Sequence, residues 1–493
     1  MQRPERLRIK NESGQLQSLP DGAEYFQDLG GEGEILFLGL GPAPGLAPKI
    51  FPEKKSFYYI ESPALTAQLP EAYTIPDNFK QITPDKRTDI SGFRVIMYTP
   101  GRRLFPSFWE PLLAGLAMSR TGITNKKRDK TVWIPGDKHS LLVPELCRAF
   151  ADEGFTYRVI EPDAMRRKLL NLLHSELPEL VLSINFKGLD SSGEIFFMLR
   201  EAGVKVAVWM VDNPFHVISG IKSAYWKDVP LLVTDHWFIP ALKKHGATKV
   251  EHLPLATDTT IFNTGIRPYP DLDKRTVFVG RSSFPMKDNF FSGCTFTIED
   301  EKAALQAIEN ATKPDFAWWE KRTGIDKFWP GREIRNAGFK TEQSGLIWRI
   351  ISLQKAGKAL TVFGDAGWSK YLPHADLRPP VDYFSTLPSI YAGAEINLNM
   401  TSPLLPYGLT QRNFDVWATG GFLLSDYTPG LSIFPEELLP HCTFTFPAEI
   451  EEKTDYIRSH PKLTKELSKN WLEIIKNEHT YKNRITKILN FFN

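Results

Sequence analysis

Short apolar runs alternate with amphipathic segments along most of this chain. In its middle third, apolar runs of strand length fall at 131–136, 155–162, 179–186, 204–214, 230–235 and 250–258. The segments between them, at 139–154, 163–176, 191–203 and 238–246, carry apolar residues at helical spacing, and several end at a glycine. Strands that are apolar throughout and are separated by helices predict a parallel sheet with helices on both faces.

A second alternation of the same kind follows a linker. Residues 261–274 are rich in Pro, Gly and Asp, which indicates an irregular connection. Strands are then predicted at 275–281 and within 359–368, 379–400 and 412–427, with helices at 299–312 and 341–357 around an aromatic-rich insertion and a helical tail from residue 454. The pattern predicts an α/β fold of two Rossmann-like parallel-sheet lobes facing a cleft, where such sheets bind ligands.

The beginning of the chain predicts a smaller α/β unit, with strands at 33–41, 57–62 and 93–101, a helix at 108–122 and an exposed basic linker at 125–130. The turn GLGPAPG at 39–45, with Glu61 after the next strand, is similar to a dinucleotide or S-adenosylmethionine loop. Its G-x-G-x-x-x-G spacing and its two prolines depart from that fingerprint, so we expect a turn without a cofactor.

These patterns divide the chain into four parts. We expect an N-terminal α/β accessory domain at 1–125, a first lobe at 126–265, a second lobe at 266–475, and a C-terminal helix at 476–493 that can pack back on the first lobe.

Composition narrows the class of protein. Lys plus Arg number 60 and Asp plus Glu 58, so the chain has no overall basic field and we expect no nucleic-acid partner. The three cysteines have no metal-ligand spacing, and so few fit a reducing compartment. Without a signal-peptide core or an apolar run of about 18 residues, the sequence predicts no membrane span and a cytoplasmic protein.

The strongest chemical signal lies at 409–426, LTQRNFDVWATGGFLLSD, where a predicted helix leads through Gly420 and Gly421 into a buried strand. The first turn of a helix offers N–H groups and a positive dipole end to an anion such as a diphosphate. Arg412 in that turn adds a guanidinium fork suited to phosphate oxygens. Asp415, three residues later, can accept hydrogen bonds from both ribose hydroxyls of a nucleotide. A solvated ion pair at a helix start is the alternative interpretation.

Polar residues also follow other predicted strands. Gly364 and Asp365 form either a turn that approaches a nucleotide or an ordinary strand-end turn. Asp212 follows the apolar strand and His216 stands four residues later, so either can act as a base or orient a substrate hydroxyl. A polar turn stabilised by Asn-Pro is the alternative there. The sequence contains no P-loop, no Ser-His-Asp pattern and no Asp-x-Asp pair at a strand end.

The stretch RNFDVWATGGFLLSD resembles the hallmark of the CgeB-like (spore-maturation) glycosyltransferases, which belong to the GT-B group related to group 1 glycosyltransferases. Further pieces of that pattern occur in the expected order: WMVDNP (209–214), HLPLATD (252–258), TVFVGR (276–281), TVFGDAGW (361–368), EINLNM (395–400) and HTYKNR (479–484). The resemblance covers roughly residues 130–493.

The resemblance implies that the second lobe holds a UDP-, dTDP- or GDP-sugar donor and that the first lobe binds a protein or glycan acceptor. Group 1 enzymes commonly carry a Glu-x7-Glu pair, whose second position is matched here by Asp415. The first position holds Tyr407, next to Gly408, which breaks the pattern. Arg281 and Lys287 match the cations that bind the diphosphate in the group, although Lys287 can equally belong to a solvated loop.

The resulting hypothesis is a glycosyltransferase that moves a sugar from a nucleoside-diphosphate sugar to an acceptor hydroxyl. We expect no cofactor and no metal, because protein cations and helix dipoles can take over the role of a divalent ion. Two alternatives stay open, a nucleotide-sugar epimerase of the same fold and a catalytically decayed nucleotide-sugar-binding scaffold.

Overall fold

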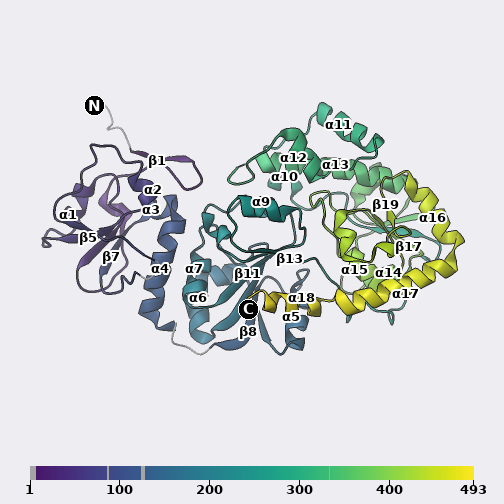
Figure 1. Cartoon of the computed structure of the whole chain (residues 1–493), viewed down its shortest axis with the longest axis horizontal. Helices are drawn as coiled ribbons and strands as arrows, with labels where there is room; N and C mark the ends of the chain where they lie inside the picture. Colours follow the sequence, from purple (N-terminus) through teal and green to yellow (C-terminus); the bar gives the residue numbers. More distant parts are fainter. Residues whose placement is uncertain (1–6, 86–87, 124–127, 332, 493) are drawn as a thin grey trace.

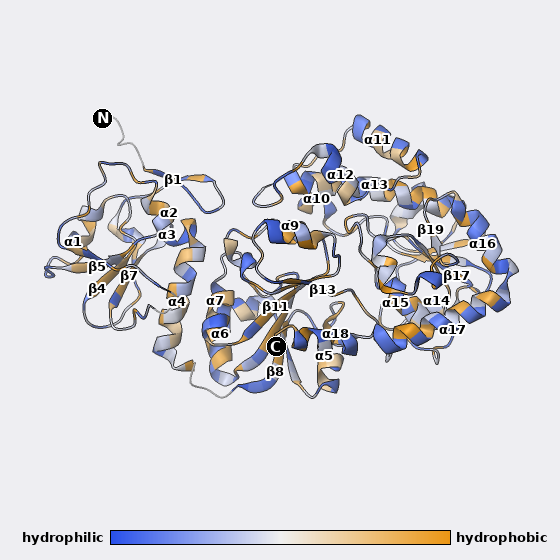
Figure 2. Cartoon of the chain, in the orientation of Figure 1, coloured by the Kyte–Doolittle hydropathy of each residue, from blue (hydrophilic) through white to orange (hydrophobic). Residues whose placement is uncertain are grey.

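Three sheets of five or six strands follow one another along the molecule (Figure 1). The computed structural model describes residues 7–85, 88–123, 128–331 and 333–492. The central strands of the sheets are mostly hydrophobic, whereas the helices carry both hydrophilic and hydrophobic residues (Figure 2). The predicted fold class is confirmed, since two six-stranded parallel sheets follow a smaller α/β unit.

The N-terminal unit has five strands in the order β3-β7-β4-β5-β6, of which only β3 runs antiparallel. They are β3 (Phe26–Asp28), β4 (Ile35–Leu38), β5 (Phe57–Ile60), β6 (Phe79–Gln81) and β7 (Arg94–Tyr98), preceded by the hairpin of β1 (Arg8–Lys10) and β2 (Leu16–Ser18). Its helices are α1 (Ala47–Ile50), α2 (Pro63–Thr66), α3 (Thr99–Leu104) and α4 (Pro106–Thr121). The predicted boundary at residue 125 and the first half of the predicted basic linker, 125–127, lie outside the described residues. The last two residues of that linker, Asp129 and Lys130, begin a strand instead.

Protein side chains fill the crevice of this first sheet. The strand order reverses between β4 and β7, the place where such a sheet binds a nucleotide. Gly39 and Gly41 have φ angles of 82° and 69°, and a Cβ added to them would lie 3.3 Å and 3.0 Å from the Tyr98 side chain. Tyr98 is buried there and donates a hydrogen bond to the carbonyl oxygen of Pro20.

The predicted first lobe is the middle lobe of the molecule, and the predicted second lobe is its third. The middle lobe has the strand order β13-β12-β11-β10-β8-β9. Its strands are β8 (Asp129–Pro135), β9 (Thr156–Ile160), β10 (Pro178–Ile184), β11 (Lys205–Met210), β12 (Leu231–Val233) and β13 (Val250–His252), and its helices are α5 (Val143–Asp152), α6 (Pro162–Ser175), α7 (Glu194–Glu201), α8 (Pro214–Ile218) and α9 (Phe238–Lys244). Val206, Val208 and Met210 pack in one core cluster, and Ala207 and Trp209 in another. Both faces of β11 are therefore buried, which is why its sequence is apolar throughout.

The third lobe has the strand order β16-β15-β14-β17-β18-β19, which is that of dinucleotide-binding folds. Its strands are β14 (Thr276–Val279), β15 (Leu360–Phe363), β16 (Asp376–Arg378), β17 (Ile396–Asn399), β18 (Leu423–Asp426) and β19 (Thr443–Phe444). The helices α14 (Leu387–Gly393) and α15 (Arg412–Ala418) connect the later strands. The order reverses between β14 and β17, so the carboxyl ends of these two strands open the crevice in which a ligand is expected.

An insertion between β14 and β15 joins the two large lobes. It consists of α10 (Lys287–Phe290), α11 (Ile298–Glu309), α12 (Phe316–Thr323) and α13 (Glu333–Lys355). Phe316, Phe328 and Ile334 of this insertion belong to the same hydrophobic cluster as Met210 and Phe238 of the middle lobe. The insertion therefore spans the two lobes above the gap between their sheets (Figure 1).

The C-terminal tail returns to the middle lobe. It comprises α16 (Glu449–Ser459), α17 (Pro461–Glu478) and α18 (Tyr481–Asn490), and α18 packs against α5. Arg484 is 1% exposed, and its guanidinium donates to the carbonyl oxygens of Pro254 and Leu255 at 2.8 and 2.9 Å. These bonds attach the tail to the segment that connects the lobes. None of the helices within the described ranges has the length and apolarity needed to cross a lipid bilayer.

Candidate functional site

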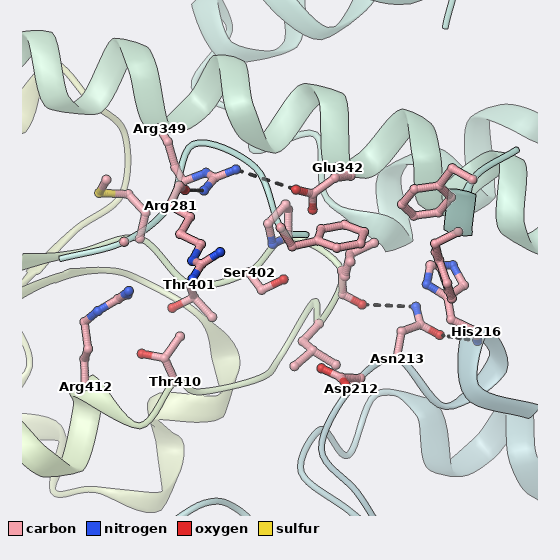
Figure 3. Close-up of a pocket in the computed structure, with 18 of the residues that line it drawn as sticks. Asp212, Asn213, His216, Arg281, Glu342, Arg349, Thr401, Ser402, Thr410 and Arg412 are labelled. Carbon is pink, nitrogen blue, oxygen red and sulfur yellow. Dashed lines mark hydrogen bonds and ion pairs between the residues drawn. The ribbon is translucent and has the colours of Figure 1, made fainter. Parts of the chain in front are cut away.

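A cavity of about 600 Å³ lies between the two large lobes, where β11, β14 and β17 end (Figure 3). The middle lobe and the third lobe both contribute walls, and the insertion forms its roof. The residues that line it are Asp212, Asn213, His216, Val217, Phe278, Gly280, Arg281, Phe284, Phe290, Phe291, Glu342, Arg349, Met400, Thr401, Ser402, Pro403, Leu404, Leu405, Thr410 and Arg412. The cavity therefore opens at the carboxyl ends of β14 and β17, where the strand order reverses.

Three arginines from separate elements reach this cavity. Arg281 follows β14, Arg349 projects from α13, and Arg412 is the first residue of α15. Arg412 donates to the side-chain oxygen of Asn399 at 2.7 Å and to the carbonyl oxygen of Val279 at 2.5 Å, which fixes its guanidinium beside both strand ends. The Arg281 side chain is exposed.

The positive charge at this point is only partly compensated by the protein. Arg349 donates to the carbonyl oxygen of Arg281 at 2.7 Å, and its nearest carboxylate, that of Glu342, is 3.6 Å away. Burial lowers the pKa of Arg349, Glu342 acts in the opposite direction, and the positive charge of Arg412 lowers it further. An anion bound between Arg349 and Arg412 would relieve this repulsion, because an opposite charge stabilises both cations.

Asp212 faces the cavity from the middle lobe. Its Oδ2 accepts a hydrogen bond from the side-chain amide of Asn185 at 2.8 Å, and Asn185 accepts in turn from the backbone N–H of Val211 at 2.9 Å. The Asp212 side chain is exposed toward the cavity. Desolvation by the protein around it raises the pKa of its carboxyl group, and the hydrogen bond from Asn185 acts in the opposite direction. A carboxylate of raised pKa with free access is suited to accept a proton from a bound hydroxyl.

His216 lines the same cavity but is held in a packed wall. Its Nε2 lies 3.3 Å from the carbonyl oxygen of Ile334, so this nitrogen carries the proton and donates it. The rings of Phe290, Phe291 and Phe316 surround it at 5.7 to 6.0 Å. Burial lowers the pKa of His216 to about 4, so the imidazole is neutral at physiological pH and shapes the wall.

Lys287, Gly364 and Asp365 do not line the cavity. The Lys287 ammonium is buried behind it and donates to the side-chain oxygen of Gln343 at 3.2 Å. Asp365 accepts from the backbone N–H and the hydroxyl of Ser282 at 2.8 and 2.5 Å. Gly364 is needed for close packing, because an added Cβ would lie 2.4 Å from the carbonyl oxygen of Gly280. Gly364 and Asp365 therefore support the loop that carries Arg281.

The structure also places Asp415 away from the cavity, contrary to the expected ribose contact. Asp415 is 1% exposed, and its oxygens accept hydrogen bonds from the hydroxyls of Thr257 at 2.7 Å and Tyr383 at 2.8 Å. Thr257 belongs to the connection between the lobes. Asp415 and Arg412 are three residues apart, but in the seven-residue helix α15 their side chains point to different neighbours.

The remaining predicted residues are spread over other places. The backbone N–H of Tyr407 donates to Asp235 at 3.0 Å, and its ring packs against His236 at 5.2 Å, outside the cavity. Gly408 follows in the same segment. Gly420, with a φ of 77°, and Gly421 end α15 on the side away from the cavity and line a separate hollow beside α17. Their role is the turn from α15 into β18.

Sequence reasoning missed several residues that line the cavity. Glu342 and Arg349 stand seven residues apart within the predicted helix 341–357, so they share one face, but nothing in the sequence indicates what that face meets. Thr401 and Ser402 follow β17, and Thr410 precedes α15. Within the described residues, no group of three or more His, Cys, Asp and Glu side chains could hold a metal ion.

One family model matches part of the third lobe. Residues 348–490 match the family model described as glycosyl transferase-like. No curated protein sequence matches the chain.

Several solved structures have a similar course of the chain. A glycosyltransferase from Rickettsia africae shows 9% identity and a TM-score of 0.46, with 74% of this chain and 98% of that chain covered. HepE from Anabaena, crystallised with UDP and glucose, shows 10% identity and a TM-score of 0.41 over 73% and 99% of the two chains. The T4 phage enzyme BGT, in complex with its UDP-glucose substrate, shows 10% identity and a TM-score of 0.38 over 73% and 97%.

The family match covers the lobe that contributes Arg349 and Arg412, and the two facing parallel-sheet lobes are the GT-B architecture. Residues 348–490, which make up most of the third lobe beyond α13, are therefore a glycosyl transferase-like region.

Proposed function

We propose that this protein transfers a sugar from a nucleoside-diphosphate sugar to an acceptor hydroxyl on a protein or a glycan. The observation that carries the proposal is the convergence of Arg281, Arg349 and Arg412 at the point where the strand order of the third lobe reverses. A diphosphate is the anion that such a crevice of a dinucleotide-type sheet is suited to bind.

The chemistry follows from the charges around the cavity. The bond between the sugar carbon C1 and the diphosphate oxygen breaks, and negative charge grows on the departing nucleoside diphosphate. The three guanidinium groups stabilise that charge. Asp212, on the opposite wall, accepts the proton of the acceptor hydroxyl as its oxygen forms the new bond to C1.

We further propose that the reaction needs no divalent metal, because the arginines supply the positive charge. The transferase should keep its activity in excess EDTA. Activity that EDTA abolishes and manganese restores would contradict this part of the proposal.

The cysteines and the sequence motifs support two finer assignments. Cys147, Cys294 and Cys442 are all free thiols, which fits the reducing cytoplasm as the place where the protein works. The order of the motifs between residues 209 and 484 supports the CgeB-like branch of these transferases.

A thermal-shift series tests the function. We expect UDP, dTDP or GDP to stabilise the protein, since a ligand at 100 times its Kd adds about 2.7 kcal/mol. The best nucleotide is then supplied as its sugar, alone and with candidate acceptors. Stabilisation by no nucleoside diphosphate would refute the proposal, conversion of the donor without an acceptor into an isomeric sugar would favour an epimerase, and binding without any turnover would favour a scaffold.

A further inference from the structure

Glu342 is a buried carboxylate in the cavity for which no hydrogen-bond donor is found among the described residues. It projects from α13, is 8% exposed, and comes no closer than 3.6 Å to the Arg349 guanidinium. A buried carboxylate normally accepts several hydrogen bonds, because burying it without them costs free energy. The cavity is the side from which such donors can come.

The neighbouring cations do not supply these donors. The Lys287 ammonium donates to the side chain of Gln343, and Arg349 donates to the carbonyl oxygens of Arg281 and Ser282 at 2.7 and 3.4 Å. Burial raises the pKa of Glu342, and these two cations act in the opposite direction. Glu342 therefore keeps its acceptor oxygens free for a ligand.

The position of Glu342 relates it to the diphosphate site. Glu342 and Arg349 are two turns apart on one face of α13, and their charged groups come to within 3.6 Å of each other. Both point into the cavity (Figure 3). A diphosphate bound at the arginines would direct the group attached to it along this wall toward Glu342.

We propose that Glu342 recognises the donor sugar by accepting hydrogen bonds from its hydroxyls, and that it thereby selects uncharged sugars and rejects sugars that carry a carboxylate. The inference rests on the proposed function. A neutral ring offers hydroxyl donors to the carboxylate, whereas a uronic acid brings a second negative charge to the same place, where like charges in a buried site repel strongly. Glu342 thus acts as a specificity-determining residue.

The test compares matched ligands on the full chain by calorimetry. UDP, UDP-glucose, UDP-galactose and UDP-glucuronic acid are titrated, or the dTDP or GDP compounds if that nucleotide binds more tightly. We expect the wild type to bind at least one neutral sugar nucleotide tenfold or more tightly than the glucuronic acid compound. Glu342→Gln should reduce this ratio to less than threefold and change the Kd of the bare nucleoside diphosphate less than threefold.

Two further variants control the experiment. Glu342→Asp keeps the charge and should keep the discrimination against the uronic acid. Glu333→Gln removes a carboxylate from the exposed start of the same helix and should leave all ratios unchanged.

Each outcome decides a separate point. Equal binding of neutral and acidic sugars by the wild type, or an unchanged ratio in Glu342→Gln, overturns the role of Glu342 while nucleotide binding stands. Binding of no nucleoside diphosphate at all overturns the proposed function and this inference together. If Glu342→Gln fails to fold, Glu342→Ala is measured in its place with the same expected loss of discrimination, and an unchanged ratio in that variant overturns the role of Glu342.

Discussion

The substitution Arg281→Gln removes one positive charge from the cavity and little else. The Arg281 side chain is exposed, and the contact this residue makes with Arg349 uses its backbone carbonyl oxygen, which the substitution keeps. We therefore expect the variant to fold as the wild type does and to differ in its affinity for a nucleoside diphosphate.

The magnitude follows from the lost contact. A hydrogen bond between charged partners contributes about 1.5–3 kcal/mol, which corresponds to a roughly 10- to 150-fold higher Kd. Arg281→Lys keeps the charge but loses the fork that fits phosphate oxygens, so its Kd should lie between the two. Because part of the attraction is long-range, added salt should weaken binding by the wild type more than binding by Arg281→Gln.

Calorimetric titration with UDP at two salt concentrations measures these effects, and the Tm of the free proteins reports folding. Arg267→Gln is the matched control, since Arg267 is exposed in the linker between the lobes and does not line the cavity. A Kd for Arg281→Gln within twofold of the wild type, with UDP bound tightly to both, would refute the assignment of the diphosphate to this cavity.

Two further predictions concern buried carboxyl groups. Asp415→Ala leaves the hydroxyls of Thr257 and Tyr383 without their acceptor. The free energy of unfolding should fall by about 1–3 kcal/mol for each of these two hydroxyls. Calorimetry should find the affinity for UDP unchanged. A stable Asp415→Ala protein with much weaker UDP binding would restore the ribose contact. In the N-terminal unit, burial raises the pKa of Glu61 to about 7 from an ordinary value of 4.5, against hydrogen bonds from the backbone N–H groups of Leu40 and Ser62. Between these pH values the folded protein keeps a proton that the unfolded chain has released, so the free energy of unfolding should fall by about 3 kcal/mol as pH rises from 4.5 to 7. Denaturant unfolding at pH 5 and pH 8 should show a flatter dependence for Glu61→Gln, and an identical dependence would exclude this titration.

The long, strongly patterned elements could be predicted from the sequence because the spacing of apolar residues within each segment shows which of its positions are buried. The strands β8, β10 and β11 and the helices α5 and α6 lie where apolar runs and helical spacing predict them. The short edge strands β6, β16 and β19 could not be predicted, since three or fewer residues at the edge of a sheet leave no recognisable pattern. The predicted strand at 250–258 ends at His252, because the following residues connect the lobes.

The candidate site was predicted in part. Asp212, His216, Arg281 and Arg412 stand at strand or helix ends that a parallel sheet directs toward its ligand-binding edge, and the structure brings all four to one cavity. Asp415 belongs to the same motif as Arg412 but lies on the other side of a short helix. A motif determines the order of residues along the chain but not the directions of their side chains. Within one helical turn, two side chains can point to different neighbours.

The alternation of strands and helices could be predicted from the chain alone, and with it two parallel sheets with Asp212 and Arg281 at strand ends and Arg412 at the start of a helix. These follow from local burial and from the geometry of parallel strands, which a single segment of chain already encodes. That α13 brings Glu342 and Arg349 to the cavity became visible only in the folded molecule. That outcome depends on how the insertion packs across both lobes, a set of contacts between residues far apart in the chain that no local pattern specifies.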